Sequence, residues 1–392
     1  MDMFRVQTLN QIAEKGLQVL GGERYEVGER MDHPDGILLR SYSLHQEEFS
    51  KDLKAIARAG AGVNNIPVER CTEKGIVVFN TPGANANAVK ELIIASLIMS
   101  SRNIINGVSW TKNLEGEEVP QLVESGKKQF VGSEIAGKRL GVIGLGAIGA
   151  LVANDALALG MDVVGYDPYI SVETAWRLST HVQRAFSLDE IFATCDYITL
   201  HIPLTNQTKG MIGEHAVEKM KKGMRLFNFS RGELVDEKVL QKALEEEIIA
   251  HYVTDFPNEN VIKMKNVTAT PHLGASTSES EENCAVMAAR QLREYLETGN
   301  IRNSVNYPNV ELPYIGKKRI TIMHQNVPNM VGQITGCLAE HHINIADMIN
   351  RSKHSWAYTM IDIDNGIDDI IKENIVENIS KITGVVAVRM IV

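Results

Sequence analysis

Three glycines and one aspartate in the middle of the chain have the spacing of a dinucleotide-binding turn. An apolar run from residue 139 leads into Gly144, Gly146 and Gly149, and a helix-like run follows. Gly144 allows a sharp turn, Gly146 leaves room for a pyrophosphate beside the backbone, and Gly149 lets helix and strand pack closely. A second apolar run ends at Asp167, whose carboxylate suits ribose hydroxyls and repels a 2′-phosphate. The pattern predicts a βαβ unit that binds NAD in preference to NADP.

Arg231, Glu259 and His272 are the residues that we expect to act on a substrate. The planar guanidinium of Arg231 can bind a carboxylate through two hydrogen bonds and polarise an adjacent carbonyl. An imidazole titrates near neutral pH, so His272 can exchange a proton with a hydroxyl while the nicotinamide moves a hydride. Glu259 would pair with this imidazole and favour its charged form. No metal ion is needed, although each residue also has a structural alternative, as an ion-pair partner or an ordinary loop residue.

The elements that carry these side chains are strands that end in polar residues. The runs 196–203, 224–231, 250–255 and 266–272 end at or near His201, Arg231, Asp255 and His272. In a doubly wound parallel sheet the ligand crevice lies beyond the carboxyl ends of the strands, so the four residues converge. We therefore predict a Rossmann-like, NAD-binding domain over residues 101–282.

Residues 1–100 have the pattern of a first α/β domain that lacks a dinucleotide glycine triad. We expect strands at 36–40 and 75–79 and a helix at 47–57. Loops of small residues at 40–43 and 59–65 let backbone amides approach a ligand, which favours a substrate-binding role. A long apolar helix is expected at 86–101, an irregular connection at 111–137, and a helix at 278–298 that Gly299 ends.

The last part of the chain predicts a third, smaller domain over residues 318–392. Strands at 319–324, 345–352, 356–364 and 385–392, with one helix after the first and another at 368–382, give the order βαββαβ. This order is ferredoxin-like.

Composition limits the class of protein. The chain has 392 residues, 44% of them hydrophobic, so two or three packed domains are expected. A net charge of −9 without a basic block argues against nucleic acid as a partner. No apolar run approaches about 20 residues and no leader-like segment opens the chain, which predicts a cytoplasmic protein without a membrane partner. The four cysteines lie far apart, which predicts packing thiols and neither disulfides nor a metal site.

Four motifs resemble the D-isomer-specific 2-hydroxyacid dehydrogenases over residues 1 to about 310. They are Gly-Leu-Gly-Ala-Ile-Gly, Asn-Phe-Ser-Arg-Gly-Glu-Leu-Val-Asp, Thr-Asp-Phe-Pro-Asn-Glu and Thr-Pro-His-Leu-Gly-Ala-Ser. With its C-terminal unit the chain resembles the phosphoglycerate-oxidising members that carry an ACT regulatory domain. The resemblance implies a catalytic set at Arg231, Glu259 and His272. The third motif departs from the usual Asp-Val-Phe-x-x-Glu, because its aspartate stands one position late, at Asp255.

The resemblance also implies a flavodoxin-like substrate domain, residues 1–100 completed by 283–315, that closes over the coenzyme. The substrate carboxylate would meet Gly62 and Val63, and its phosphate Arg40 and Arg58, although Ser43-Leu44 replaces a frequent Thr-Lys pair. Implied coenzyme contacts are Gly144, Gly146, Ala147, Ile148, Gly149, Asp167, His201, Pro203, Thr208, Ser230, Asp255 and Gly274. An L-serine effector would bind at His324, Asn326 and Asn344 in a homodimer or homotetramer, with Pro328-Asn329 where the family favours Pro-Gly.

Three functions are compatible with these patterns. The first is NAD-dependent oxidation of 3-phospho-D-glycerate to 3-phosphohydroxypyruvate, the first step of L-serine biosynthesis, with feedback by serine. The second is a glyoxylate or hydroxypyruvate reductase of the same family, which gives no reason for the C-terminal unit. The third is a non-catalytic, NAD-sensing binding protein, against which the intact Arg231, Glu259 and His272 argue.

Overall fold

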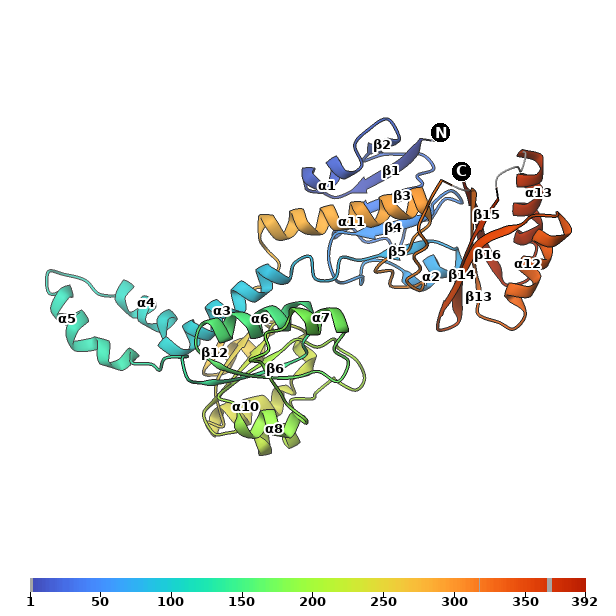
Figure 1. Cartoon of the computed structure of the whole chain (residues 1–392). Helices are drawn as coiled ribbons and strands as arrows, with labels where there is room; N and C mark the ends of the chain where they lie inside the picture. The colour runs from blue at the N-terminus through green and yellow to red at the C-terminus, as the bar shows by residue number, and fades with distance from the viewer. Residues whose placement is uncertain (1–2, 317, 365–368) are drawn as a thin grey trace. The chain divides into compact units, whose positions relative to one another are not determined.

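The chain forms two compact units, which are described separately. The computed structural model describes residues 3–316, 318–364 and 369–392 (Figure 1). Unit 1 combines Met1–Asn85 with Glu281–Val392, and unit 2 is Ala86–Ser280. Parallel sheets with helices fill most of both units, and a small antiparallel sheet lies near the C-terminus. The predicted fold class is confirmed.

Unit 2 is built on a seven-stranded parallel sheet with the order β12-β11-β10-β9-β6-β7-β8. The order reverses between β6 and β9, which is where a doubly wound sheet opens a ligand crevice. One face of the sheet packs on α3 and α6, and the other packs on α8, α9 and α10. Its strands are β6 (Arg139–Ile143), β7 (Asp162–Tyr166), β8 (Gln183–Arg184), β9 (Tyr197–Leu200), β10 (Met224–Asn228), β11 (Ile249–Thr254) and β12 (Val267–Ala269). Its helices are α3 (Ala86–Arg102), α4 (Ile104–Lys112), α5 (Val119–Gly126), α6 (Ala147–Ala158), α7 (Val172–Arg177), α8 (Leu188–Thr194), α9 (Glu214–Lys219) and α10 (Glu237–Glu245), with short 3-10 turns η1 (Lys127–Phe130), η2 (Gly232–Leu234) and η3 (Val261–Lys263).

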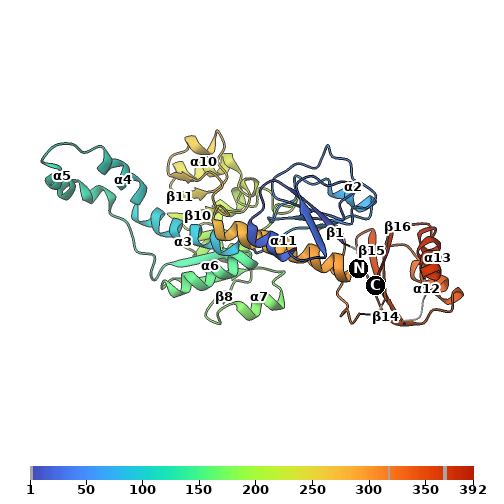
Figure 2. The same cartoon turned by 90° about the horizontal axis from the view of Figure 1, so that it is seen from above.

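The segment after α3 differs from the expected irregular connection, because α5 and η1 lie within residues 111–137. Neither α4 nor α5 buries a residue within the chain, and both helices extend beyond the end of α3 (Figures 1 and 2). Several of their apolar side chains are 40–50% exposed, namely those of Ile104, Ile105, Val108 and Leu122. Such helices bury no face in the chain's own core, so hydrophobic periodicity could not predict them. Among the described residues, no single helix is long and apolar enough to cross a bilayer; α3 and α4 pass that test only as a pair, and they bend by 67°.

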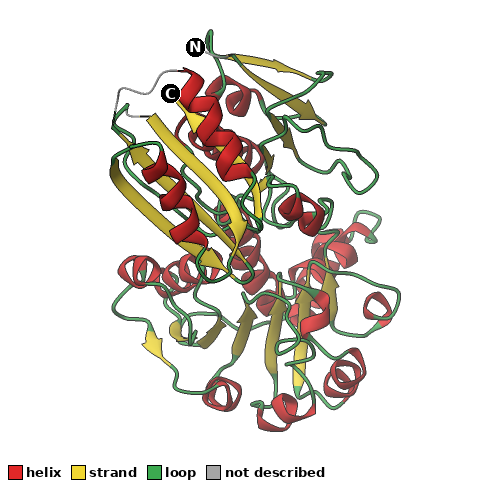
Figure 3. Cartoon of the chain, turned by 90° about the vertical axis from the view of Figure 1, so that its right-hand side faces the viewer, coloured by secondary structure: helices red, strands yellow, loops and turns green. Residues whose placement is uncertain are grey.

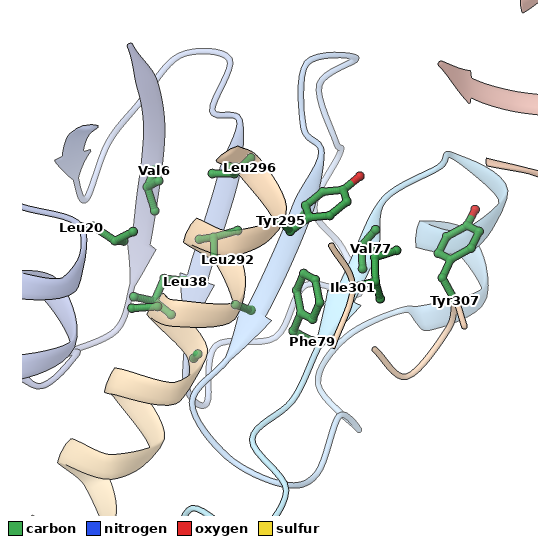
Figure 4. Close-up of a cluster of buried hydrophobic side chains, with 14 of the residues drawn as sticks. Val6, Leu20, Leu38, Val77, Phe79, Leu292, Tyr295, Leu296, Ile301 and Tyr307 are labelled. Carbon is green, nitrogen blue, oxygen red and sulfur yellow. The ribbon is translucent and has the colours of Figure 1, made fainter. Parts of the chain in front are cut away.

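Unit 1 begins with a five-stranded parallel sheet of flavodoxin-like order, β2-β1-β3-β4-β5. The helix α11 lies across one face of this sheet, where Leu292 and Tyr295 pack against Leu38 and Phe79 (Figure 4). The helix expected at 47–57 is wrong: residues 55–58 form β4, buried between β3 and β5, because a central strand must be apolar on both faces. The elements are β1 (Phe4–Leu9), β2 (Tyr25–Gly28), β3 (Gly36–Leu39), β4 (Ala55–Arg58), β5 (Val77–Phe79), α1 (Glu14–Val19), α2 (Val68–Glu73) and α11 (Ser278–Thr298).

The C-terminal part of unit 1 is a four-stranded antiparallel sheet with the order β14-β15-β13-β16. Two helices cover one face (Figure 3), where Ile320 and Ile322 pack against Ile334 and Ile375. Its elements are β13 (Lys318–Gln325), α12 (Met330–Glu340), β14 (Ile345–Lys353), β15 (Trp356–Ile363), α13 (Asp369–Ser380) and β16 (Val385–Ile391). Residue 368, the expected start of the last helix, lies outside the described residues. The element order confirms the ferredoxin-like prediction.

The other face of this sheet packs directly on the first part of unit 1. Met323, Tyr358 and Met360 share a hydrophobic cluster with Phe79 and Tyr307. Polar groups also join the two parts: the Tyr358 hydroxyl donates to the Gly299 carbonyl at 2.7 Å. The C-terminal sheet is thus part of the core of unit 1.

Arg319 is the largest fully buried side chain in this interface. Its Nε and Nη2 bind the two carboxylate oxygens of Asp362 at 2.6 and 2.9 Å. Nη1 donates to the carbonyls of Thr298 and Leu312, and Nη2 donates to that of Pro313. All five N–H donors of the guanidinium are therefore satisfied, as burial of this charge requires.

Candidate active site

The glycine turn after β6 has the geometry that a dinucleotide needs. Gly144 has φ +92°, and a Cβ there would lie 2.5 Å from the His201 carbonyl oxygen. A Cβ on Gly149 would lie 2.0 Å from the Gly144 carbonyl oxygen, so α6 can pack this closely only with glycine at both positions. A Cβ on Gly146 would meet nothing within 4 Å, and no side chain caps the first amides of α6, at Ala147 and Ile148. Open space beside uncapped helix amides suits a pyrophosphate.

Asp167 is fixed beside this turn by two backbone amides. Its Oδ2 accepts a hydrogen bond from Leu145 N and its Oδ1 accepts one from Tyr169 N, both at 2.8 Å. A carboxylate oxygen has a second lone pair, so Asp167 can still accept ribose hydroxyls. The residues present therefore fit the coenzyme.

The neighbouring strand ends bring further predicted residues to the same edge of the sheet. The Ser230 hydroxyl donates to the Leu200 carbonyl at 2.7 Å, which links the ends of β10 and β9. The Thr208 hydroxyl donates to the Pro203 carbonyl at 2.7 Å, and this bond closes the loop after β9. His201 lies 3.0 Å from the Thr199 hydroxyl through Nε2, and burial lowers its pKa to about 3. His201 is thus neutral at working pH and does not serve as a cation for phosphate.

Arg231 and His272 both lie against one aromatic ring, that of Phe256. The His272 ring centroid lies 4.9 Å from that of Phe256, and the Arg231 guanidinium carbon lies 5.9 Å from it. The buried Asn228 side chain donates to the Arg231 carbonyl at 2.8 Å and thereby shapes the turn after β10. Sequence analysis assigned no role to Phe256 or Asn228, although both lie inside the motifs that carry Asp255 and Arg231.

Asp255 lies beneath the loop that carries His272. The residue is 2% exposed, and its carboxylate accepts hydrogen bonds from the Thr270 hydroxyl at 2.6 Å and from the backbone amides of Leu273 and Gly274 at 2.7 Å. Hydrogen bonds to a charged group contribute about 1.5–3 kcal/mol each, which offsets the cost of burying the carboxylate. These hydrogen bonds tie the end of β11 to the loop of residues 270–274.

Glu259 is placed differently from Arg231 and His272. Its carboxylate pairs with Lys263 Nζ at 2.7 Å, and its side chain is 84% exposed. In the part of the chain that the structure describes, no hydrogen bond joins Glu259 to His272. The pairing of this glutamate with the imidazole therefore stays a prediction.

Unit 1 holds the predicted substrate residues. The Arg58 guanidinium lies along the loop after β4: a Cβ on Gly60 would lie 2.5 Å from its Nη1, and one on Gly62 would lie 3.6 Å from it. Arg58 Nε also donates to the Arg40 carbonyl at 3.0 Å. Arg40 itself pairs with Glu281 at 2.7 Å. The structure thus brings Arg58 together with Gly62 and Arg40, next to Val63 in the same loop.

The predicted effector residues do not come together within one chain. His324 is buried and bonds the Thr359 hydroxyl through Nε2 and the Gln325 carbonyl through Nδ1, both at 2.8 Å. Asn326 follows the same end of β13, whereas Asn344 precedes β14 near the opposite end. These two levels are six residue steps apart along β15, from Ala357 to Ile363, which corresponds to about 20 Å.

Comparison with known proteins agrees with this geometry. Residues 94–274 match the NAD-binding domain of the D-isomer specific 2-hydroxyacid dehydrogenases. The chain therefore contains an NAD-binding domain of this kind. The chain is 36% identical over 338 residues to the D-3-phosphoglycerate dehydrogenase of Methanocaldococcus jannaschii. The aligned region covers 84% of this chain and 62% of that protein.

Two solved structures have a similar fold. The NAD⁺-bound 3-phosphoglycerate dehydrogenase of Entamoeba histolytica has a TM-score of 0.59 and 29% identity, over 78% of this chain and 99% of that one. A glyoxylate reductase from Paecilomyes thermophila has a TM-score of 0.62 and 25% identity, over 78% of this chain and 99% of that one. The first curated relatives are longer proteins: the chain spans 62%, 60% and 58% of their lengths.

Proposed function

We propose that this protein is an NAD-dependent dehydrogenase that oxidises 3-phospho-D-glycerate to 3-phosphohydroxypyruvate, the first step of L-serine biosynthesis. The observation that carries the proposal is that Arg231 and His272 both lie against Phe256, after the carboxyl ends of strands in the sheet whose strand β6 leads into the glycine turn. Homology to D-3-phosphoglycerate dehydrogenases supports this substrate above other 2-hydroxy acids.

The chain's own residues divide the work. Arg231 binds the substrate carboxylate through its planar fork and polarises the carbonyl that forms. An unprotonated nitrogen of His272 accepts the hydroxyl proton of the substrate as the C–H bond breaks. Asp167 and the first amides of α6 hold the ribose and the pyrophosphate. NAD supplies the acceptor for the hydride.

Phosphate recognition would come from unit 1. Arg58 lies beside the loop of Gly60 and Gly62, so its guanidinium has fixed surroundings, and Arg40 can exchange Glu281 for a phosphate oxygen. The test is NAD reduction with 3-phosphoglycerate, glycerate and lactate as substrates. We expect the phosphorylated acid to be strongly preferred, and Arg58→Ala to reduce kcat/KM for it more than for glycerate. Activity on the unphosphorylated acids alone would instead support a glyoxylate or hydroxypyruvate reductase.

A second copy of the chain is the partner that we propose for α4 and α5. No residue of α4 or α5 is buried. Large apolar side chains on and after these helices are between 40% and 80% exposed, namely Ile104, Ile105, Val108, Leu122 and Val131. Apolar area of this kind usually marks an interface. Sedimentation of the full chain should show a homodimer or homotetramer that Val108→Glu dissociates, and a monomeric wild-type protein would contradict the proposal.

We also propose L-serine as a regulatory ligand of the C-terminal sheet. The proposal is supported by the exposed amide of Asn326 near the buried His324, whereas Asn344 lies at the opposite end of the sheet. Serine at millimolar concentrations should inhibit the full chain, and Asn326→Ala should weaken the inhibition. An unchanged rate would leave the sheet with the packing role described above.

The unpaired thiols Cys71, Cys195, Cys284 and Cys337 support a reducing compartment, and we propose the cytoplasm. Cell fractionation tests this location.

A further inference from the structure

The loop that carries His272 has an unusual backbone that needs support from outside. His272 has φ +54°, a left-handed conformation that residues other than glycine seldom adopt. Its amide donates to the Thr270 carbonyl at 2.9 Å, which closes a tight turn of residues 270–272 that ends at the histidine. A conformation of this kind persists only when surrounding contacts impose it. The direction of the imidazole therefore depends on what holds residues 270–274.

The Asp255 carboxylate provides these contacts on both sides of His272. Oδ1 accepts from the Thr270 hydroxyl, two residues before the histidine, and from the Leu273 amide, directly after it. Oδ2 accepts from the Gly274 amide, and a Cβ on Gly274 would approach this oxygen to 3.1 Å. Three donors thus converge on one buried carboxylate.

The position of this aspartate in the sequence explains its direction. Successive side chains at the end of a strand point to opposite sides, so a shift of one residue reverses the side chain. In the Asp-Val-Phe-x-x-Glu pattern the aspartate would stand one residue earlier, where this chain has Thr254. The Thr254 hydroxyl donates to the Asn228 carbonyl at 3.1 Å and accepts a hydrogen bond from Phe256 N. An aspartate at 255 points instead beneath the histidine loop, next to Phe256, whose ring contacts His272.

We propose that Asp255 is a positioning residue that fixes the His272 imidazole through the backbone of residues 270–274. The role differs from the coenzyme contact expected at this position, because the three hydrogen bonds and the near-complete burial commit the carboxylate to the loop. Phe256 holds the ring while Asp255 holds the backbone, so consecutive residues of one strand end fix both parts of the histidine. The inference rests on the proposed function of His272 in proton transfer.

The first test does not depend on catalysis. In Asp255→Asn, the amide nitrogen must face one of the three donors, so it cannot accept all of their hydrogen bonds. Hydrogen exchange of peptides covering residues 270–276 should become at least tenfold faster in the full-length variant. Asp196→Asn is the matched control, because Asp196 also accepts a backbone amide in unit 2, from Arg139, but lies at the amino end of β9. Unchanged exchange at 270–276 in Asp255→Asn would overturn the proposal.

The second test is a kinetic double-mutant cycle on whichever acid the enzyme turns over. Asp255→Asn should lower kcat by about tenfold to a hundredfold, because a displaced catalytic group loses rate steeply, with little change in KM for NAD. In a His272→Ala background the same substitution should have almost no further effect on kcat. Action through His272 would be refuted if the two substitutions lowered kcat independently, so that the loss in the double variant equalled the product of the two single losses. A raised KM for NAD with unchanged kcat in Asp255→Asn would also refute it.

A milder variant keeps the test usable if Asp255→Asn does not fold. Thr270→Val removes a single donor and should show the same pattern with smaller changes. If no acid is oxidised, the proposed function fails, while the exchange result still decides whether Asp255 holds the loop.

Discussion

Replacing Arg319 with methionine should destabilise unit 1 far more than the loss of an ordinary ion pair. Methionine keeps much of the side-chain volume but removes all five N–H donors. Asp362, which is 4% exposed, then loses its partner inside the protein, and the carbonyls of Thr298, Leu312 and Pro313 each lose a donor. The perturbation therefore acts at the joint between the C-terminal sheet and the rest of unit 1.

The size of the effect follows from the burial of the pair. Removing one partner of a buried ion pair costs about 3–5 kcal/mol, because an uncompensated charge remains. This corresponds to at least about a hundredfold change in the unfolding equilibrium. A double variant, Arg319→Met with Asp362→Leu, removes the uncompensated charge and should recover part of the loss. Arg302, whose pair with Glu311 is exposed, provides a control of about 0–1 kcal/mol when it is replaced by alanine.

Urea unfolding followed by the fluorescence of Trp356 measures unit 1 specifically. Trp356 lies on β15 and its ring contacts Tyr307, whereas Trp110 and Trp176 belong to unit 2 and can be replaced by phenylalanine. If Arg319→Met shifts the midpoint no more than Arg302→Ala does, the argument from five satisfied donors is wrong.

Three further outcomes are expected in unit 2. Asp167→Ala should reduce the preference for NAD over NADP by about fivefold, because a carboxylate and a 2′-phosphate about 4 Å apart repel by about 1 kcal/mol even in water. Equal kcat/KM of the wild-type protein with both coenzymes would contradict this reasoning. His272→Ala should lower kcat by about 10²–10⁴-fold with little change in NAD affinity measured by calorimetry. Arg231→Ala should lower kcat and also raise KM for the acid. Near-normal turnover of His272→Ala would mean that another group accepts the substrate proton. Burial lowers the pKa of His201 to about 3 and that of His251 to about 4, so below pH 6.5 the unfolded chain takes up protons that the folded chain does not. Stability should thus fall by up to about 1.4 kcal/mol per pH unit for each histidine between pH 6.5 and 4, and His251→Gln should flatten this slope in denaturant midpoints.

The chemistry at strand ends could be predicted from sequence because parallel sheets impose it. Gly144, Asp167, Arg231 and His272 are far apart in the chain, but each follows an apolar run, and doubly wound topology brings such ends to one edge. The glycine triad was equally predictable, since its conformations and close approaches exclude side chains.

Other features depend on contacts that local patterns do not encode. The apolar spacing of Phe49, Leu53 and Ile56 imitates a helix, yet pairing with β3 and β5 makes residues 55–58 a central strand. The three donors to Asp255 come from residues 270–274, whose loop conformation no periodicity indicates. The exposed apolar side chains of α4 and α5 pack on no core within the chain, and we explain them only by the proposed contact with a second copy.

Unit 1 is discontinuous in the sequence, and this has a consequence for synthesis on the ribosome. Strands β1–β5 are translated first, but α11, which covers one face of their sheet, follows only after the whole of unit 2. At about 5–20 residues per second, residues 86–280 take about 10 to 40 seconds to emerge. Unit 2 can fold as a continuous segment during this interval, while the apolar residues of the first sheet await their partners. The first sheet is therefore translated before unit 2 but completed after it, and during this interval chaperones would meet its exposed apolar surface.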